Sequence, residues 1–201
     1  MSEENFLTFK KILTKDPLMA TIKLARYKFV SKMLDKNDYV VDVGCGGGLS
    51  TFYYSNFCRK AVGIDNDVRR IEECRDFKNK KLDFVHLNAL DISKLKFDVN
   101  CIVNVDFIEH ITKKEGIIFI KNSKQFLENQ KNRRNKMLII GTPSYYSKNY
   151  RAKHNLLHHK YEYKPDELYD ICAENFPRVF KFTMNDELVH TGFDKLGWFF
   201  F

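Results

Sequence analysis

The sequence predicts a doubly wound α/β fold, with a seven-stranded, mostly parallel sheet that ends in an antiparallel hairpin. Short apolar segments alternate with segments of helical periodicity, and a glycine-rich turn follows the first apolar segment. No helix of useful length separates the last two strand-like segments, which favours a terminal hairpin. Near-continuous apolar strands are typical of a sheet with both faces covered by helices.

The first elements are helical. Apolar residues recur at helical spacing from Pro17 to Leu34, which predicts an amphipathic helix, and a weaker pattern favours another helix over Phe6 to Leu13. Residues 1–35 are therefore expected to form an N-terminal helical cap. The β-branched run from Tyr39 to Val43 predicts the first buried strand.

The strand and helix patterns then alternate along the chain. Further strands are expected at Ala61 to Asp65, Asp83 to Leu87, Asn100 to Val105 and Lys136 to Gly141. Helices of crossover length are expected at Leu49 to Cys58, Asp67 to Phe77 and Lys113 to Leu127. The terminal hairpin is assigned to Arg178 to Met184 and Gly197 to Phe201.

Composition indicates one compact soluble domain over residues 1–201, because the chain is 44% hydrophobic and 30% charged. The 34 basic and 26 acidic residues give a net charge of +8, which permits a phosphate-bearing partner without requiring one. Five cysteines without a C-x-x-C pair indicate free thiols in a reducing cytoplasm. No apolar run approaches the ~20 residues that cross a bilayer, and the first residues lack a signal-peptide pattern.

A glycine loop connects the first strand to the next helix. The segment from Asp42 to Gly48 lets a ligand approach the backbone, and Asp65 closes the next strand, where doubly wound folds place a carboxylate on ribose hydroxyls. The plainer alternative is a tight packing turn, with Asp65 capping a helix. The glycine spacing is G-x-G-x-G, and Asp42 lies two residues before Gly44, which suits a cationic ligand better than a dinucleotide pyrophosphate.

These residues resemble the first motif of class I S-adenosylmethionine-dependent methyltransferases, and the terminal hairpin is similar to that family. The resemblance covers about residues 20–201 and implies S-adenosylmethionine as cofactor. It implies that Gly44, Gly46 and Gly48 face the methionine and ribose, that Asp42 lies near the amino group, and that Asp65 holds the ribose. The cofactor set it implies is Asp42, Gly44, Cys45, Gly46, Gly48, Asp65, Asn66, Asn88, Ala89 and Asn104, with Asn88 in place of a more usual acid.

A second group of polar residues follows the fourth strand. If residues 106–110 form one helical turn, Asp106, Glu109 and His110 share a face. Three interpretations compete: ordering of the loop around the cofactor, acid/base catalysis by His110, and a metal site. Histidines at 154, 158 and 159 could add a ligand from the loop after the fifth strand.

The pattern D-x-x-E-H with a later histidine resembles the metal pattern of small-RNA 2′-O-methyltransferases and of ubiquinone-pathway O-methyltransferases. The resemblance implies Asp106, Glu109, His110 and His159 as metal-binding and catalytic residues, with Asp106 in place of a glutamate. A metal there would lower the pKa of an acceptor hydroxyl. A solvated basic loop is the alternative, and it is favoured for His158.

Residues 143–164 are expected to form an insertion that covers the substrate. Aromatic and basic residues alternate there and could stack on bases or on sugar rings. The segment from Met184 to Phe193 resembles one in uncharacterised bacterial methyltransferases associated with surface-polysaccharide clusters. The candidate substrate residues are Tyr145, Tyr150, Asn185 and His190.

The favoured function is O-methylation of a small molecule, such as a sugar or nucleotide-linked sugar. The alternatives are a metal-dependent RNA ribose 2′-O-methyltransferase and a cofactor-binding protein without enzymatic activity. A basic cluster at Lys131, Arg133, Arg134 and Lys136 is interpreted as a solvated turn away from catalysis. No membrane partner is expected, and the pattern leaves the oligomeric state open.

Overall fold

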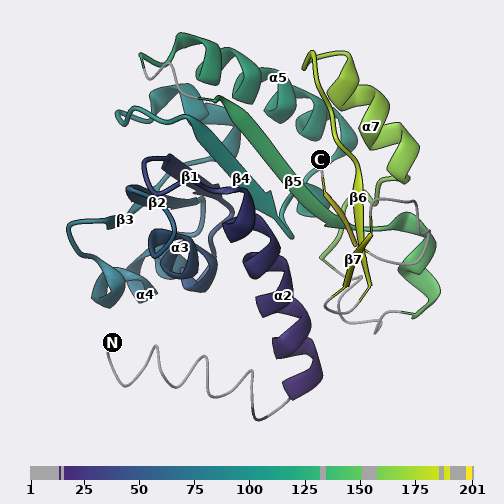
Figure 1. Cartoon of the computed structure of the whole chain (residues 1–201), viewed down its shortest axis with the longest axis horizontal. Coiled ribbons are helices and arrows are strands. Elements are labelled where there is room, and N and C mark those ends of the chain that lie inside the picture. Colours follow the sequence, from purple (N-terminus) through teal and green to yellow (C-terminus); the bar gives the residue numbers. More distant parts are fainter. Residues whose placement is uncertain are drawn as a thin grey trace.

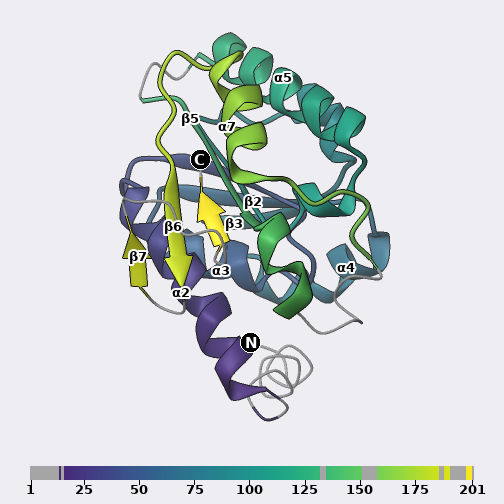
Figure 2. The same cartoon turned by 90° about the vertical axis from the view of Figure 1, so that its right-hand side faces the viewer.

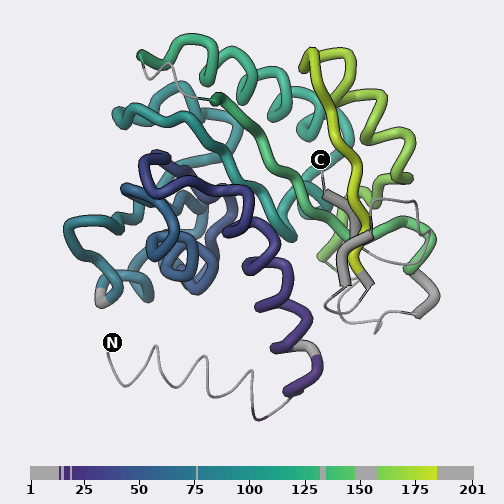
Figure 3. The backbone as a smooth tube through the Cα atoms, viewed as in Figure 1, coloured from purple at the N-terminus to yellow at the C-terminus, as the bar shows by residue number. Residues whose placement is uncertain are grey.

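We describe a computed structural model of the chain, covering residues 14, 16–131, 135–150, 158–185, 188–190 and 198–200. Its centre is an eight-stranded sheet in the order β3-β2-β1-β4-β5-β8-β6-β7 (Figure 1). The first five strands are parallel, and the backbone path through them can be followed in Figure 3. They are β1 (Tyr39–Val43), β2 (Lys60–Asp65), β3 (Leu82–His86), β4 (Cys101–Val105) and β5 (Met137–Pro143).

Helices cover both faces of this sheet, as the near-continuous apolar strands predicted. On one face lie α5 (Lys113–Asn129) and α7 (Pro165–Ala173), whose buried residues form one core cluster with Val41, Ile64 and Ile102. On the other face lie α2 (Pro17–Met33), α3 (Leu49–Ser55) and α4 (Val68–Glu73). The first turns of α2 project beyond the sheet in Figures 1 and 3.

The short elements between these helices are 3₁₀ turns. They are η1 (Arg75–Phe77), η2 (Ala89–Lys94), η3 (Ile108–His110) and η4 (Tyr145–Tyr150). Three of them, η2, η3 and η4, follow the strands β3, β4 and β5, so they lie at the carboxyl edge of the sheet. This edge is where open α/β sheets bind ligands.

The C-terminal hairpin is confirmed, but the count of seven strands is wrong. Strand β8 (Trp198–Phe200) pairs antiparallel with both β5 and β6 (Phe182–Asn185), and Figure 2 shows β6 and β8 side by side. The additional strand is β7 (Leu188–His190), which pairs antiparallel with β6. In the sequence this segment was interpreted as part of a polar hairpin connection.

The helix α7 was not predicted, although its start carries a clear signal. Pro165 occupies the first turn, where a missing N–H costs nothing, and Glu167 accepts a hydrogen bond from the Lys164 N–H at 3.3 Å. Pro165, Leu168 and Cys172 form its buried side. The weaker helix predicted over Phe6 to Leu13 lies outside the described residues. Within the described ranges, no helix is long and apolar enough to cross a membrane.

Candidate active site

The glycine loop joins β1 to α3 through three residues with left-handed backbone angles. The φ values of Gly44, Gly46 and Gly48 are 75°, 51° and 80°, a region that costs a side-chain-bearing residue about 1–2 kcal/mol. The Gly44 and Cys45 N–H groups donate to the Ile64 carbonyl at 2.9 and 3.1 Å, so the loop is tied to the end of β2. The chain therefore turns sharply from strand to helix.

The three glycines have different surroundings. A Cβ on Gly44 would collide with the Phe107 ring, and a Cβ on Gly48 would lie 2.8 Å from both Cys74 Sγ and the Phe84 ring. A Cβ on Gly46 would meet no atom of the described part of the chain within 4 Å. Gly48 thus allows close packing inside the protein, whereas Gly46 borders open space. The expectation that all three glycines face the cofactor stays a prediction.

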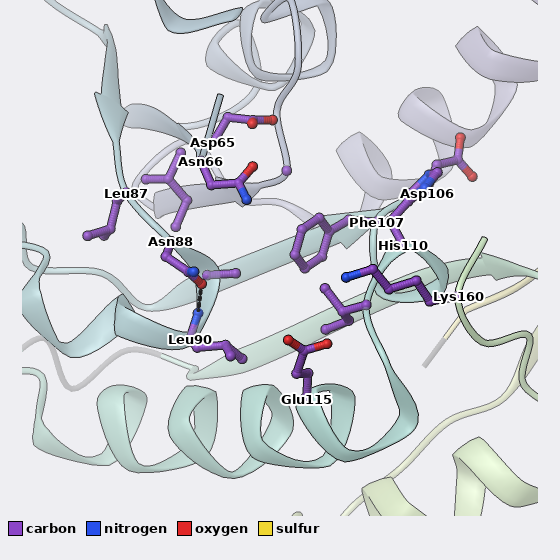
Figure 4. Close-up of a pocket in the computed structure, with 14 residues that line it drawn as sticks. Asp65, Asn66, Leu87, Asn88, Leu90, Asp106, Phe107, His110, Glu115 and Lys160 are labelled. Carbon is purple, nitrogen blue, oxygen red and sulfur yellow. Dashed lines mark hydrogen bonds between the residues drawn. The ribbon is translucent and has the colours of Figure 1, made fainter. Parts of the chain in front are cut away.

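A pocket of about 380 Å³ opens at the carboxyl edge of the sheet, beside this loop (Figure 4). This volume lies within the range that holds a small molecule or cofactor. Its wall is formed by the ends of β1 and β2, by the segment after β3, and by the segment after β4. The lining residues are Gly44, Ile64, Asp65, Asn66, Leu87, Asn88, Ala89, Leu90, Asp106, Phe107, His110, Ile111, Glu115 and Lys160.

Half of the predicted cofactor set lines this pocket. Gly44, Asp65, Asn66, Asn88 and Ala89 are in the wall. Asp65 also supports the loop, because its Oδ2 accepts from the Gly46 N–H at 3.0 Å and its Oδ1 from the Asp67 N–H at 2.9 Å. Asn88 caps η2 by accepting from the Leu90 N–H at 2.9 Å, which leaves its amide nitrogen as a donor toward a ligand.

The other predicted cofactor residues lie outside the wall. Gly46 and Gly48 are in the loop, Cys45 is buried beneath it, and Asn104 is fully buried in β4. Both polar atoms of the Asn104 side chain are buried, and neither has a hydrogen-bond partner among the described residues. Contact of these residues with a cofactor stays a prediction.

Asp42 is buried under α3 and does not line the pocket. Its Oδ2 accepts hydrogen bonds from Ser50 Oγ at 2.6 Å and Thr51 Oγ1 at 2.7 Å. Burial raises the pKa of Asp42 to about 6, although the hydrogen bonds from the two hydroxyl groups lower it. The negative charge of Asp65 adds to the rise. The carboxylate is therefore kept ionised at neutral pH at a cost to folding.

We expect Asp42→Asn to stabilise the protein relative to wild type as pH rises. The folded-state pKa lies above the unfolded value, so the cost of ionising Asp42 is absent at low pH, appears between pH 4 and 6, and is complete above that range. The asparagine does not titrate, and its Oδ1 can still accept from both hydroxyls. The free energy of unfolding of the variant minus that of wild type should rise by roughly 2–3 kcal/mol from pH 4 to 7.5. Urea unfolding at several pH values measures it, and a difference that does not change with pH contradicts it.

Asp106 does not lie in one helical turn with Glu109 and His110, so that part of the predicted geometry is wrong. It has a φ of 56°, and η3 begins only at Ile108. Its Oδ2 pairs with Arg26 Nη2 at 2.7 Å, and Figure 4 shows its carboxylate turned away from the pocket. The left-handed backbone at Asp106 redirects the chain, so the carboxylate meets α2.

Arg26, the ion-pair partner of Asp106, was not predicted from the sequence. It comes from α2 and is 1% exposed. A signal was present, because Arg26 falls four residues before Val30 on the buried stripe of the helix, where a cation needs a partner.

Glu109, His110 and His159 come together at this edge. One ligand atom from each lies within 4.8 Å of the others, and the His110 and His159 rings meet edge to face at 5.0 Å between centroids. Among the described residues, Asp106 is not part of this cluster. The structure thus assembles three of the four predicted ligands from two segments about fifty residues apart in sequence.

Each member of this cluster is oriented by a neighbour. Glu109 Oε2 accepts from Thr142 Oγ1 at 3.0 Å, His110 Nδ1 lies 3.1 Å from the His158 carbonyl, and His159 Nδ1 lies 2.8 Å from Glu162 Oε1. Such partners fix the ring orientation in metal-binding histidines.

Burial sets the charge balance of the cluster. It raises the pKa of Glu109 to about 8, with a further rise from the charge of Asp106, and it lowers the pKa of His110. A carboxyl group that is 1% exposed needs either a proton or a cation beside it. Neutral imidazoles with a carboxylate form a donor set that divalent metals accept.

The structure describes only some of the side chains that were predicted to contact the substrate. Tyr145 is 42% exposed, its N–H donates to the Tyr163 carbonyl at 3.0 Å, and Lys164 Nζ lies 5.6 Å from its ring centroid. Tyr150 ends η4, Asn185 ends β6 and His190 ends β7, and the side chains of these three lie outside the described part of the chain. Lys160 extends into the pocket toward Phe107 in Figure 4.

Comparison with known proteins identifies a methyltransferase domain in this chain. Residues 40–130 match a family model described as a methyltransferase domain. The chain is also 33% identical, over 156 residues, to a ubiquinone biosynthesis O-methyltransferase from Pelagibacter ubique, and the match covers 70% of this chain and 61% of that protein. Residues 40–130 are a methyltransferase domain, similar to those of class I S-adenosylmethionine-dependent methyltransferases. The chain spans less than two thirds of the length of this curated relative.

Solved structures share the class I methyltransferase fold. The methyltransferase domain of a bacterial Hen1 protein has a TM-score of 0.67 at 17% identity, and the match covers 89% of this chain and 97% of that one. The N-methyltransferase NodS from Bradyrhizobium japonicum WM9, solved with S-adenosylhomocysteine, has a TM-score of 0.63 at 14% identity, covering 98% and 95%. At these identities the likeness to other class I methyltransferases shows the fold alone.

Proposed function

We propose that this chain transfers a methyl group from S-adenosylmethionine to a hydroxyl oxygen of a small acceptor, with a divalent metal at Glu109, His110 and His159. The observation that carries the proposal is the convergence of these three side chains beside the pocket at the carboxyl edge. The name of the curated relative, an O-methyltransferase, supports oxygen as the acceptor atom.

The residues present fit the cofactor. Asp65 ends β2 in the pocket wall, where its carboxylate can accept from ribose hydroxyls, and Asn88 and Ala89 border the space for the adenine. When bound, S-adenosylmethionine supplies a methyl group on a positively charged sulfur, which is a strong electrophile.

The residues also fit a divalent metal. Two imidazoles and one buried carboxylate offer three ligand atoms close enough to share one ion, and Thr142 and Glu162 hold two of them in place. When bound, the metal supplies a positive charge that lowers the pKa of an acceptor hydroxyl. His110, whose pKa is lowered, stays neutral at physiological pH and can take up a proton or bind the ion.

The proposed acceptor is a sugar or a nucleotide-linked sugar, as in surface-polysaccharide synthesis. Two tyrosines support this choice, because Tyr145 and Tyr146 are both about 40% exposed at the start of η4, which follows β5 at the same edge. Aromatic faces beside a basic group stack on sugar rings and bases. Lys164, above the Tyr145 ring, and Lys160, in the pocket wall, supply positive charge for a phosphate.

The second candidate is 2′-O-methylation of an RNA ribose. The bacterial Hen1 methyltransferase domain and the small-RNA methyltransferase HEN1 are similar in fold, the latter with a TM-score of 0.66 at 18% identity. The match covers 87% of this chain and 24% of HEN1. Both candidate functions are methyl transfer to a hydroxyl oxygen, so they differ only in the acceptor molecule.

A transfer assay with methyl-labelled S-adenosylmethionine tests the proposal. We expect label in nucleotide-sugars or free sugars, stimulation by Mn²⁺ or Mg²⁺, and loss of transfer with a chelator. Label in short RNA alone would favour the second candidate. Transfer that is insensitive to chelator would remove the metal from the mechanism, and cofactor binding without transfer to any hydroxyl compound would contradict the proposed activity.

A further inference from the structure

A second concave region lies at the amino edge of the sheet, opposite the pocket. It is an open basin of about 650 Å³, lined by Asn37, Tyr39, Arg59, Lys96, Phe97, Asp98 and Lys131. Tyr39 begins β1, whereas Gly44 follows the last residue of β1 at the other edge, so the strand separates the two regions. We call this region the amino-edge basin. Its residues take no part in the proposed methyl transfer.

Positive charge predominates in the amino-edge basin. Arg59, Lys96 and Lys131 are exposed cations in its lining, against Asp98 as the acid. Lys60 adds a fourth cation beside it, with Nζ 4.8 Å from the centroid of the Phe97 ring. These cations come from three separate connections, after α3, before β4 and after α5, and the fold gathers them.

Two aromatic rings form the floor of the basin. Tyr39 and Phe97 are half-buried and meet edge to face, with centroids 5.8 Å apart. Arg59 Nε donates to the Tyr39 hydroxyl at 3.0 Å, which orients the guanidinium and leaves its other N–H groups for an anion. The acid Asp38 is buried behind the basin, where its carboxylate accepts from the Asn100 amide at 2.7 Å.

We propose that the amino-edge basin is a second ligand site, which binds a nucleoside phosphate, either free or within a single RNA strand. Aromatic rings for a base, ringed by cations for phosphate, are the combination that single-stranded nucleic-acid sites use. Simple inorganic anions would bind to the cations without contacting the aromatic rings. The sequence analysis interpreted Lys131 as part of a solvated turn, and its place in this basin gives it a binding role.

The test is fluorescence anisotropy with a 5′-labelled 12-nucleotide oligouridylate, followed by competition with UMP and with inorganic phosphate. We expect saturable binding that Lys96→Ala weakens about fivefold to tenfold, with a salt slope smaller by about 0.7–1. Phe97→Leu should weaken binding at least fivefold by removing a stacking face. Competition by UMP at similar concentration identifies a free nucleotide as ligand, whereas no competition by UMP identifies the strand.

Lys94→Ala is the matched control. Lys94 is exposed, lies two residues before Lys96, pairs with Asp91 at 3.1 Å, and is outside the basin. Its removal should change binding less than twofold, and saturating S-adenosylhomocysteine should leave binding unchanged because the pocket is at the other edge. The proposal is overturned if the oligouridylate shows no saturable binding at 50 mM salt, or if Lys94→Ala and Lys96→Ala lose affinity for it equally. It is also overturned if inorganic phosphate alone, or S-adenosylhomocysteine, displaces the bound oligouridylate. These outcomes do not depend on whether methyl transfer occurs.

Discussion

Asp65→Ala is expected to weaken the binding of S-adenosylmethionine at least tenfold. The substitution removes a carboxylate that ends β2 in the pocket wall, and with it the two acceptors available to ribose hydroxyls. Hydrogen bonds to a charged group contribute about 1.5–3 kcal/mol each, so losing one already gives a factor of ten or more. Calorimetric titration of S-adenosylhomocysteine into wild type and variant measures the change.

A control is needed because Asp65 also holds the glycine loop through the Gly46 N–H. Asp65→Asn keeps an acceptor for the loop and removes the charge, so its affinity should lie between those of wild type and Asp65→Ala. Asp67→Ala removes a neighbouring carboxylate that caps α4 and does not line the pocket. It should leave affinity within a factor of two. Unchanged affinity in Asp65→Ala would refute the assignment of the pocket to the cofactor.

His159→Ala is expected to lower the methyl-transfer rate at least a hundredfold and to abolish its stimulation by divalent metal. The variant removes one of the three clustered ligand atoms, and losing even an outer partner of a metal ligand costs about 10- to 100-fold in affinity or activity. The rate as a function of Mn²⁺ concentration, measured in wild type and variant, gives both quantities.

His158→Ala is the matched control for this prediction. His158 is the adjacent, exposed imidazole, and its contact with His110 is made by the backbone carbonyl, which alanine retains. It should keep the metal response of wild type. Glu109→Gln gives a second variant, because it keeps the shape of the buried side chain and an acceptor for Thr142 while it removes the charge. A wild-type metal response in both His159→Ala and Glu109→Gln would exclude the metal site.

Local patterns were sufficient to predict the parallel half of the sheet. The segment from Tyr39 to Val43 was predicted with the bounds that the structure gives, and the next four strands were placed within two residues at each end. An apolar run that stops at a turn is a signal contained in a few neighbouring residues, so it can be recognised without knowing the fold. The glycine loop and Asp65 are signals of the same local kind.

Features that depend on contacts between distant segments could not be predicted in this way. The pairing of Arg26 with Asp106 joins residues eighty positions apart, and only the packing of α2 against the sheet edge brings them together. The left-handed backbone at Asp106 cannot be inferred from a helical spacing rule, which assumes that the helix has already begun. The amino-edge basin is likewise invisible in sequence, because its cations are spread over three connections.

The predicted cofactor residues and the proposed metal ligands follow one another along the chain. The five predicted cofactor residues in the pocket wall all precede β4, whereas the clustered Glu109, His110 and His159 all follow it. Under the proposed function, the predicted cofactor residues and the proposed metal ligands therefore occupy separate, consecutive stretches of the chain. We expect substitutions at the three clustered residues to change the metal-dependent part of the proposed reaction without replacing any of these five predicted cofactor residues. Solved structures named as an N-methyltransferase and as a small RNA methyltransferase share this fold, so in those proteins the same scaffold carries different acceptor chemistry.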